Sequence, residues 1–335
     1  SWVAWHLSRG GLHVTDRSNA AVTGLLGDQA TGWRGPLLDR LAIPVDMLPR
    51  VVDSCGDLGA ASALAGSPPI CGMAGDQQAS LIGQGCTRPG PAKATFGTGA
   101  MLDACVAERP GFATRGPHGC FPIVAWSRDE VVTWGIEAIM LAAGSAVDWL
   151  VEDLGLLASA AESEAAAAAC ADAGGALVVP ALLGLGTPAW DFGARGAFLG
   201  ISRGVGRPQL VRAVLEGIAH SGADLLEAAE ADAGISPATL RIDGGMSANR
   251  VFVQALADAC ERPVEVSRER EATALGAGYL AGLTVGIWAG EDDVARSWSP
   301  QEVVEPGTSR ADRDRWRAAV DRARAWYPEL TAVQF

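Results

Sequence analysis

An acidic residue set among glycines is the feature of this sequence best suited to chemistry. Asp76 stands in the run GMAGDQQAS at 72–80, and a second turn of small residues, TFGTG, follows at 95–99. Small residues let a backbone approach a ligand closely, and a Gly/Thr turn can offer N–H and hydroxyl donors to phosphate. We therefore predict that Asp76 is the catalytic base of a phosphoryl transfer. The alternative is a solvated Asp beside a buried tight turn.

A further glycine-rich turn, DGGMSAN at 243–249, lies between a predicted strand (239–243) and a predicted helix (250–260). A strand that leads into a helix through glycines places backbone N–H groups where an anion or a nucleotide is favoured. The run matches neither the dinucleotide fingerprint nor a P-loop. Ser247 or Asn249 could equally cap the following helix without any ligand.

Gly144 and Asp148 are four residues apart in a stretch, 137–150, that we expect to be helical. Residues at this spacing lie on one helix face. Gly144 could let a flat ring approach that face, or it could serve only helix packing.

The composition indicates a folded, acidic protein. The chain has 335 residues, of which 49% are hydrophobic, and a net charge of −13 with no Lys/Arg-rich run. This charge argues against nucleic acid or an anionic membrane as a partner. The seven cysteines are scattered and form no CxxC pair, so we expect reduced thiols and a cytoplasmic protein. The first residues do not resemble a signal peptide, and the chain starts with Ser1, which suggests that an upstream part is absent.

Alternating strands and helices from residue 70 onward predict an α/β domain with helices packed on a sheet. A segment poor in large apolar side chains, 53–69, is the candidate junction with what precedes it. The expected strands are at 92–106 (a pair), 131–134, 176–183, 239–243 and 264–267. The expected helices are at 137–150, 158–173, 250–260 and 271–286, with a long one that starts at 208 and another near the C-terminus.

Six stretches, in this order, resemble the FGGY family of carbohydrate kinases, and most closely its glycerol kinases. They are HVTDRSNA (13–20), GMAGDQQASLIGQG (72–85), KATFGTGAML (93–102), GLGTPAWDFGARGAFLGISRG (184–204), IDGGMSANRVFVQALAD (242–258) and EATALGAGYLAGLTVGIW (271–288). The resemblance implies an actin-like, ribonuclease H-like ATPase fold with its active site in a cleft between two domains. On this basis 1–66 would be the end of the first domain, 67–290 the complete nucleotide-binding second domain, and 291–335 a C-terminal helical extension.

The resemblance also implies a role for each matching residue. Asp76 would take the proton of the substrate hydroxyl as this attacks the γ-phosphate of ATP, and would hold Mg²⁺ indirectly through water. Gln77 would bind the substrate. Met101 stands where glycerol kinases usually carry an aromatic residue against the glycerol carbons, and Asp148 stands where an amide is usual. The implied nucleotide contacts are Gly97, Thr98, Gly144, Asp148, Gly245, Met246 and Asn249.

The function that the resemblance implies is ATP-dependent phosphorylation of glycerol to glycerol 3-phosphate, with ATP and Mg²⁺ as cofactors. Another FGGY sugar or polyol kinase, such as a pentulose kinase, is the first alternative. The family's first domain begins with an acidic phosphate loop and later supplies Arg-Glu, Trp and Tyr contacts to glycerol. None of these is in this sequence, which starts at Ser1. A catalytically inactive, truncated nucleotide-binding domain is therefore the second alternative. We expect the full-length protein to be a homo-oligomer, a dimer or a tetramer.

Overall fold

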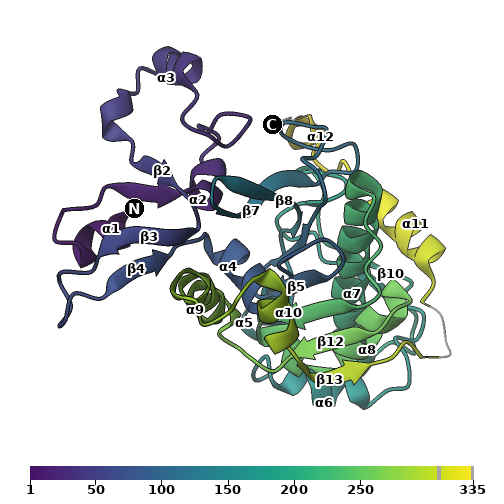
Figure 1. The fold of residues 1–335 in the computed structure, drawn as a ribbon. Helices are drawn as coiled ribbons and strands as arrows, with labels where there is room; N and C mark the ends of the chain where they lie inside the picture. The colour runs from purple at the N-terminus through teal and green to yellow at the C-terminus, as the bar shows by residue number, and fades with distance from the viewer. Residues whose placement is uncertain (308–310, 333–335) are drawn as a thin grey trace.

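A seven-stranded mixed sheet lies at the centre of the molecule (Figure 1). The computed structural model describes residues 1–307 and 311–332. The strand order is β13-β12-β11-β5-β6-β8-β7. Strands β5, β11 and β12 run parallel, and every other neighbouring pair is antiparallel. The strands are β5 (Ala92–Phe96), β6 (Ala100–Cys105), β7 (Phe121–Arg128), β8 (Val131–Met140), β11 (Leu240–Asp243), β12 (Val264–Ser267) and β13 (Pro300–Val304).

Helices cover both faces of this sheet, because alternate residues of each strand point to opposite sides. In β5, Ala92, Ala94 and Phe96 pack into the main core. Lys93 and Thr95 therefore face the other side. The helices of the main core are α5 (Gly144–Glu152), α6 (Glu162–Ala168), α7 (Arg207–Ala233) and α8 (Arg250–Cys260). The opposite layer holds α4 (Asp76–Gly83), α9 (Ala272–Val285) and α10 (Glu291–Ser297).

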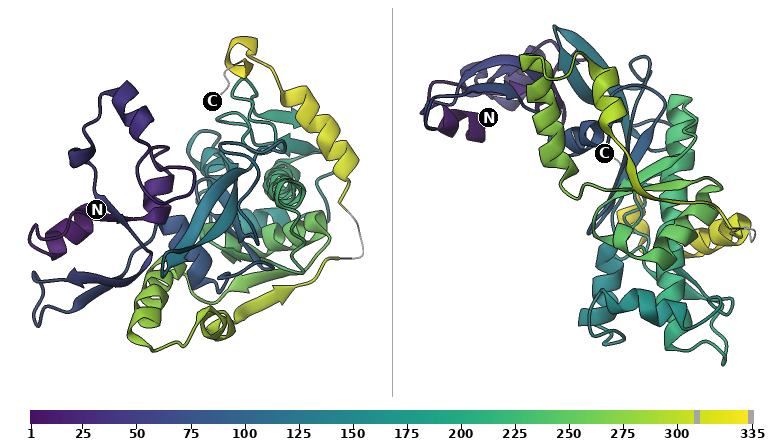
Figure 2. Two further views of the ribbon diagram at one scale, coloured as in Figure 1. Left: turned by 45° about the horizontal axis from the view of Figure 1, so that its top comes forward. Right: turned by 60° about the horizontal axis from the view of Figure 1, so that its bottom comes forward.

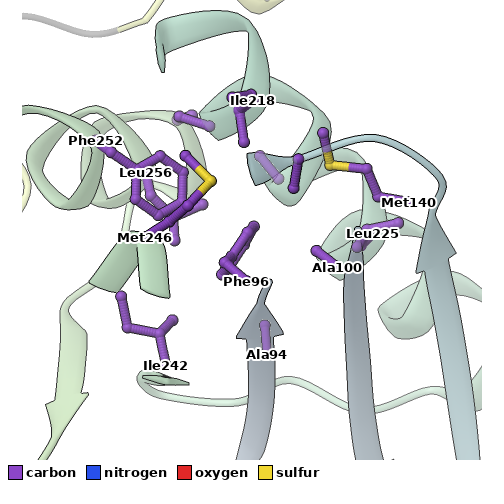
Figure 3. Packing of buried hydrophobic residues seen from close by; sticks show 14 of the residues in the cluster. Ala94, Phe96, Ala100, Met140, Ile218, Leu225, Ile242, Met246, Phe252 and Leu256 are labelled. Atoms are coloured by element: carbon purple, nitrogen blue, oxygen red, sulfur yellow. The ribbon is translucent and has the colours of Figure 1, made fainter. Parts of the chain in front are cut away.

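Aromatic packing supports the end of β5 (Figure 3). Phe96 is fully buried and meets the ring of Phe252 on α8 edge-on, with centroids 4.9 Å apart. Met246, from the 3₁₀ turn η2 (Gly245–Ala248), lies beside Phe252 and Leu256 in the same cluster. The glycine-rich turns after β5 and β11 are thus anchored on one apolar core.

Residues 1–72 form a smaller unit that projects from the side of the sheet opposite α11 (Arg313–Ala323), as both views in Figure 2 show. Its elements are α1 (Trp2–Leu7), β1 (Val14–Asp16), α2 (Arg17–Ala21), α3 (Gly35–Leu41), η1 (Val45–Met47), β2 (Arg50–Val52), β3 (Cys55–Ala60) and β4 (Pro69–Gly72). Strand β1 pairs with β2 in parallel, and β3 pairs with β4 as an antiparallel hairpin. The boundary that we predicted at 66/67 falls within the connection of this hairpin, and the domain boundaries remain predictions.

The C-terminal helix α11 docks on the long helix α7. Trp316 is 1% exposed, stacks on His220 with centroids 5.0 Å apart, and donates its indole N–H to Asp224 at 2.8 Å. Burial, with the nearby Arg313 guanidinium, lowers the pKa of His220 to about 4, so this stack is neutral at ordinary pH. The remaining elements are β9 (Leu177–Val179), β10 (Ala197–Leu199) and α12 (Pro328–Thr331).

Several predicted elements are confirmed. The predicted helix 250–260 and strand 264–267 have the bounds expected, and helix α7 begins within one residue of the predicted start. Among the described residues, no helix has both the length and the apolar content needed to cross a membrane.

The predicted helix 137–150 is wrong in its first half. Strand β8 continues to Met140, and α5 begins only at Gly144. The backbone of β8 pairs residue by residue with β6, and this places Ile136, Ala138 and Met140 in the core. The period-two burial therefore outweighs the helix propensity of this Ala-containing stretch. The Ala-rich helix is also shorter than predicted, and β13 shows that the C-terminal extension is not wholly helical.

Candidate active site

Asp76 is the first residue of α4, and its side chain is exposed. Its Oδ1 accepts the backbone N–H of Gln77 at 2.8 Å, whereas Oδ2 accepts no hydrogen bond from a described residue. The hydroxyl of Thr273, on α9, donates to the backbone carbonyl of Asp76 at 3.3 Å. One carboxylate oxygen is thus held by the helix terminus while the other is free to accept a proton.

The start of α4 is tied to the smaller unit through a buried network. Asp16 is fully buried, and its carboxylate accepts hydrogen bonds from the hydroxyls of Ser18 and Ser54. It also caps α2 by accepting the N–H groups of Ser18 and Asn19. The Ser18 hydroxyl oxygen in turn accepts the N–H of Gly75 at 2.9 Å. The residue before Asp76 is therefore fixed by an Asp that lies sixty residues earlier in the sequence.

The predicted nucleotide contacts come together around one cavity of about 440 Å³. It is lined by Gly97, Thr98, Gly144, Asp148, Gly245, Met246 and Asn249, which are all seven, together with residues that the sequence did not single out, among them Ser163, Glu164 and Leu215. The cavity thus brings together five segments that are far apart in the sequence.

Backbone hydrogen bonds build α5 directly onto the turn after β5. Gly144 N–H donates to the Gly97 carbonyl at 2.8 Å, and Ala143 and Ser145 both donate to the carbonyl of Thr98. A Cβ at Gly144 would lie 2.6 Å from the Gly97 carbonyl oxygen, so only glycine allows this approach. Gly144 therefore serves close packing on the turn after β5 and also lines the cavity, and its contact with a nucleotide ring remains a prediction.

The charges of the cavity wall are acidic. Asp148 and Glu164 line it, and the lining includes no Lys or Arg. Asn249 caps α8, since its Oδ1 accepts the N–H of Phe252 while its Nδ2 donates to Ser163 Oγ. A phosphate here would be met by backbone N–H groups and by a cation that travels with it, rather than by a basic side chain.

Three charged residues that the sequence analysis missed lie in a row beneath Gln77. Lys93, Asp103 and Glu137 are register partners across β5, β6 and β8. Lys93 and Asp103 are fully buried, and Lys93 Nζ lies 2.7 Å from Asp103 Oδ2. A Lys and an Asp inside otherwise apolar strands were the available signal, but only the register shows that they meet. Met101 lies on the same strand face, opposite Thr95.

Glu137 is expected to make stability depend on pH. Burial, with the nearby Asp103 carboxylate, raises the pKa of Glu137 to about 8 from an ordinary 4.5, although Lys93 acts in the opposite direction. The folded state therefore binds more protons than the unfolded state between these values, and stability falls as pH rises through this window. The Glu137→Gln variant lacks this loss, so its unfolding free energy relative to the parent should rise by up to about 4 kcal/mol between pH 5 and pH 8.5.

Urea denaturation of both proteins at the two pH values measures this difference. An equal difference between the proteins at both pH values would show that Glu137 titrates normally.

Asp243 presents a buried carboxylate between the two glycine-rich turns. Its Oδ2 accepts the hydroxyl of Ser80, from α4, at 3.2 Å, and its Oδ1 has no partner among the described residues. Over the part of the chain that the structure describes, no three His, Cys, Asp or Glu residues are grouped so as to hold a metal ion. A Mg²⁺ ion would thus need ligands from the nucleotide and water, as is usual for this ion.

A larger cavity, of about 600 Å³, lies between α7, α11 and the loop at 180–189. It includes none of the predicted site residues. Its wall includes Trp316 and Asp224, which dock the C-terminal helix. The predicted nucleotide contacts therefore line the smaller cavity, and Met101 lies on the face of the sheet that Lys93 shares.

A family model and two curated relatives match this chain. Residues 92–285 match the C-terminal domain of the FGGY family of carbohydrate kinases. A glycerol kinase of Halorhodospira halophila is 43% identical over 98% of this chain, and one of Symbiobacterium thermophilum is 40% identical over the same share. The chain spans about two thirds of the length of these relatives, 66% and 67% respectively.

Solved structures of carbohydrate kinases also resemble this chain. The chain superposes on Plasmodium falciparum glycerol kinase with ADP at a TM-score of 0.86 and 29% identity, covering all of this chain and 66% of the other. It superposes on a xylulose kinase from Rhodospirillum rubrum at a TM-score of 0.80 and 28% identity, covering 96% and 65%. The predicted actin-like fold is thereby confirmed.

Proposed function

Because this chain belongs to the FGGY family of carbohydrate kinases, we propose that the protein containing it transfers the γ-phosphate of ATP to a terminal hydroxyl of glycerol. The observation that carries the proposal is the convergence of all seven expected nucleotide contacts on one cavity. Asp76 lies outside this cavity, on a helix whose Ser80 reaches the same strand end as the cavity wall.

Asp76 acts as the general base in this proposal. Its free Oδ2 accepts the hydroxyl proton while the substrate oxygen forms a bond to the γ-phosphorus and the bond to the β,γ-bridging oxygen breaks, which releases ADP. Positioning and charge neutralisation carry most of the catalysis in such transfers. Gln77 orients the substrate, and the Gly97–Thr98 turn offers N–H and hydroxyl donors to phosphate.

Mg²⁺ would neutralise phosphate charge when it is bound with ATP. The buried Asp243 Oδ1, which has no partner among the described residues, fits an acceptor for the water shell of such an ion, and Asp76 would contribute to that shell through water. Both residues would act on the ion indirectly.

A pentulose kinase is the second candidate. It is favoured by Met101, which stands where the resemblance to glycerol kinases leads us to expect an aromatic side chain, and by the likeness to a xylulose kinase. A coupled assay of ADP release, run on the whole gene product with glycerol, xylulose and other polyols, separates the two. Turnover of xylulose without turnover of glycerol would refute the glycerol assignment.

The third candidate is a domain that binds nucleotide without catalysis. Residues 1–335 alone are expected to bind ADP but to show no kinase activity, because the first-domain residues that the family uses to hold substrate and phosphate are not in this sequence. Calorimetry and the coupled assay on this chain test both halves of that expectation. Turnover by residues 1–335 alone would contradict it.

Gly245→Leu should block the nucleotide cavity without disturbing the fold. A Cβ at Gly245 would have no heavy atom within 4 Å, so the added side chain occupies open space at the cavity wall. We expect ADP affinity to fall by about tenfold or more, with Tm nearly unchanged. Calorimetric titration of residues 1–335 with ADP measures this.

Gly35→Leu is the matched control for that variant, because its Cβ would also meet nothing within 4 Å and it lies far from the cavity, at the start of α3. Unchanged ADP binding by Gly245→Leu would mean that the nucleotide binds elsewhere.

A further inference from the structure

The ammonium group of Lys93 has two hydrogen-bond acceptors and one ion-pair partner. Its Nζ donates to Gln77 Oε1 at 2.9 Å and to Thr95 Oγ1 at 3.2 Å, and it is paired with Asp103 Oδ2 at 2.7 Å. Both charged side chains of the pair are 0% exposed. A buried ammonium keeps its charge only when it is paired and hydrogen-bonded in this way.

The contact with Lys93 fixes the orientation of the Gln77 amide. An ammonium group has three donors and no acceptor, so the amide atom that faces it must be the oxygen. The Nε2 group of Gln77 consequently points away from Lys93. It has no partner among the described residues, and the side chain is half-buried on the helix turn that carries Asp76.

We propose that Lys93 is a positioning residue that holds the Gln77 amide so that its Nε2 is presented beside Asp76 as a hydrogen-bond donor. The site then offers one acceptor, Asp76 Oδ2, and one donor, Gln77 Nε2, at adjacent positions of α4. This pair suits two neighbouring hydroxyls: one gives its proton to Asp76, and the oxygen of the other accepts from Gln77. This use of the pair rests on the proposed function, since glycerol carries such neighbouring hydroxyls.

Asp103 completes the arrangement from the far side. It holds Lys93 from the neighbouring strand, whereas Gln77 reaches the same nitrogen from α4. If the ammonium only neutralised Asp103, removing both charges would change KM for glycerol by the same factor whether or not the Gln77 amide is present. If Lys93 positions the amide, removing the charges already removes part of the contribution of Gln77. The two effects on KM are then not additive.

A double-mutant cycle separates these two roles. The four proteins are the parent, Gln77→Ala, Lys93→Met with Asp103→Leu, and the triple variant. Lys93 and Asp103 are replaced together because either charge left alone would be buried without its partner.

In the parent background, Gln77→Ala should raise KM for glycerol by about tenfold, which corresponds to one lost hydrogen bond. In the Lys93→Met/Asp103→Leu background its effect should shrink to about twofold or less, because the amide is no longer oriented. Equal effects of Gln77→Ala in both backgrounds would overturn the proposal.

Substrate preference gives a second readout. The parent should prefer 1,2-propanediol to 1-propanol by about tenfold or more in kcat/KM, and the Lys93→Met/Asp103→Leu variant should lose most of that preference. A preference for 1,2-propanediol that survives the loss of both charges would contradict the positioning role of Lys93.

A spectroscopic measurement tests the Lys93 contact without any activity. Residues 1–335 are labelled with ¹⁵N-glutamine, and the side-chain NH₂ pair of Gln77 is identified by its disappearance in Gln77→Glu. We expect this pair to shift in Lys93→Met/Asp103→Leu. It should stay in place in the control Arg212→Met/Glu216→Leu, which removes an ion pair of the same length on α7.

An unshifted Gln77 pair in Lys93→Met/Asp103→Leu would overturn the inference. If the whole gene product phosphorylates no polyol while the pair shifts as expected, the proposed function fails and the positioning of Gln77 by Lys93 stands.

Discussion

Asp76→Asn is expected to lower kcat of the whole gene product on glycerol by about 10³-fold, within the range that general-base catalysis usually contributes. In the parent, Asp76 Oδ1 accepts the N–H of Gln77. The substitution keeps the shape of the side chain and an oxygen that can accept this N–H. It removes the oxygen that would take the hydroxyl proton. Because Asp76 does not line the nucleotide cavity, ADP affinity should change by no more than about twofold. The coupled ADP-release assay and calorimetry measure the two quantities.

Asp153→Asn is the matched control for this experiment. Asp153 is an exposed Asp at the end of α5 whose side chain makes no hydrogen bond or ion pair with a described residue, so the substitution mainly removes a charge. We expect full activity from this variant. If Asp76→Asn retains most of its activity, another group takes the proton and the assignment of Asp76 fails. If it loses ADP binding as well, the residue supports the nucleotide site instead.

The position of Asp76 gives a physical reason for a large effect. It opens α4, where unpaired backbone N–H groups carry partial positive charge and stabilise a carboxylate. The helix start is fixed on one side by Ser18 and on the other by Thr273. A base whose helix start is held by hydrogen bonds on two sides needs little reorganisation to meet a substrate, and such positioning is what phosphoryl transfer chiefly requires.

The cavity lined by the seven predicted residues was the most predictable part of the candidate site, because its sequence signals are local. Glycines at turns that connect a strand to a helix mark places where the backbone comes close to a ligand or to another backbone segment. At Gly244 the close approach is to the protein itself: its φ is +87°, and a Cβ there would lie 2.4 Å from the Phe96 carbonyl oxygen. Of the alternatives left open for Asn249, the cap on α8 is confirmed, and its contact with a nucleotide stays a prediction although it lines the cavity.

The row of Lys93, Asp103 and Glu137 could not be predicted, because it is a property of register. Each residue lies on a different strand, and Glu137 is more than forty residues from Lys93 in the sequence. The error at 137–143 has the same origin. Nothing in the stretch itself shows that β6 will pair with it, and without that partner its Ala and Met content favours a helix. Burial of alternate residues against a sheet is a tertiary effect that overrides local propensity.

Gly276→Val is expected to destabilise the protein by about 3 kcal/mol or more, at the upper end of what overpacking usually costs. Helices α4 and α9 cross at two glycines. A Cβ at Gly276 would lie 1.8 Å from the Ala79 carbonyl oxygen, and one at Gly83 would lie 1.9 Å from the carbonyl oxygen of Ala272. Each contact is with backbone, so neither can be relieved by a rotamer change. The sequence analysis predicted that 271–286 is a helix, and its glycines are what this close packing requires.

Gly278→Ala is the control, because it lies two residues further along the same helix and its Cβ would meet nothing within 4 Å. It should stabilise the protein by up to about 1 kcal/mol, the difference in helix propensity between the two residues. Urea denaturation of residues 1–335 measures both variants. A Gly276→Val variant as stable as the parent would mean that the helices do not cross at this distance.

Gly276→Val should also lower kcat at temperatures where the protein is still folded. A displaced α4 carries Asp76 with it and breaks the contact between Thr273 and the Asp76 carbonyl. The small residues of α9 thus set the position of Asp76, the proposed general base, as well as the stability of the fold.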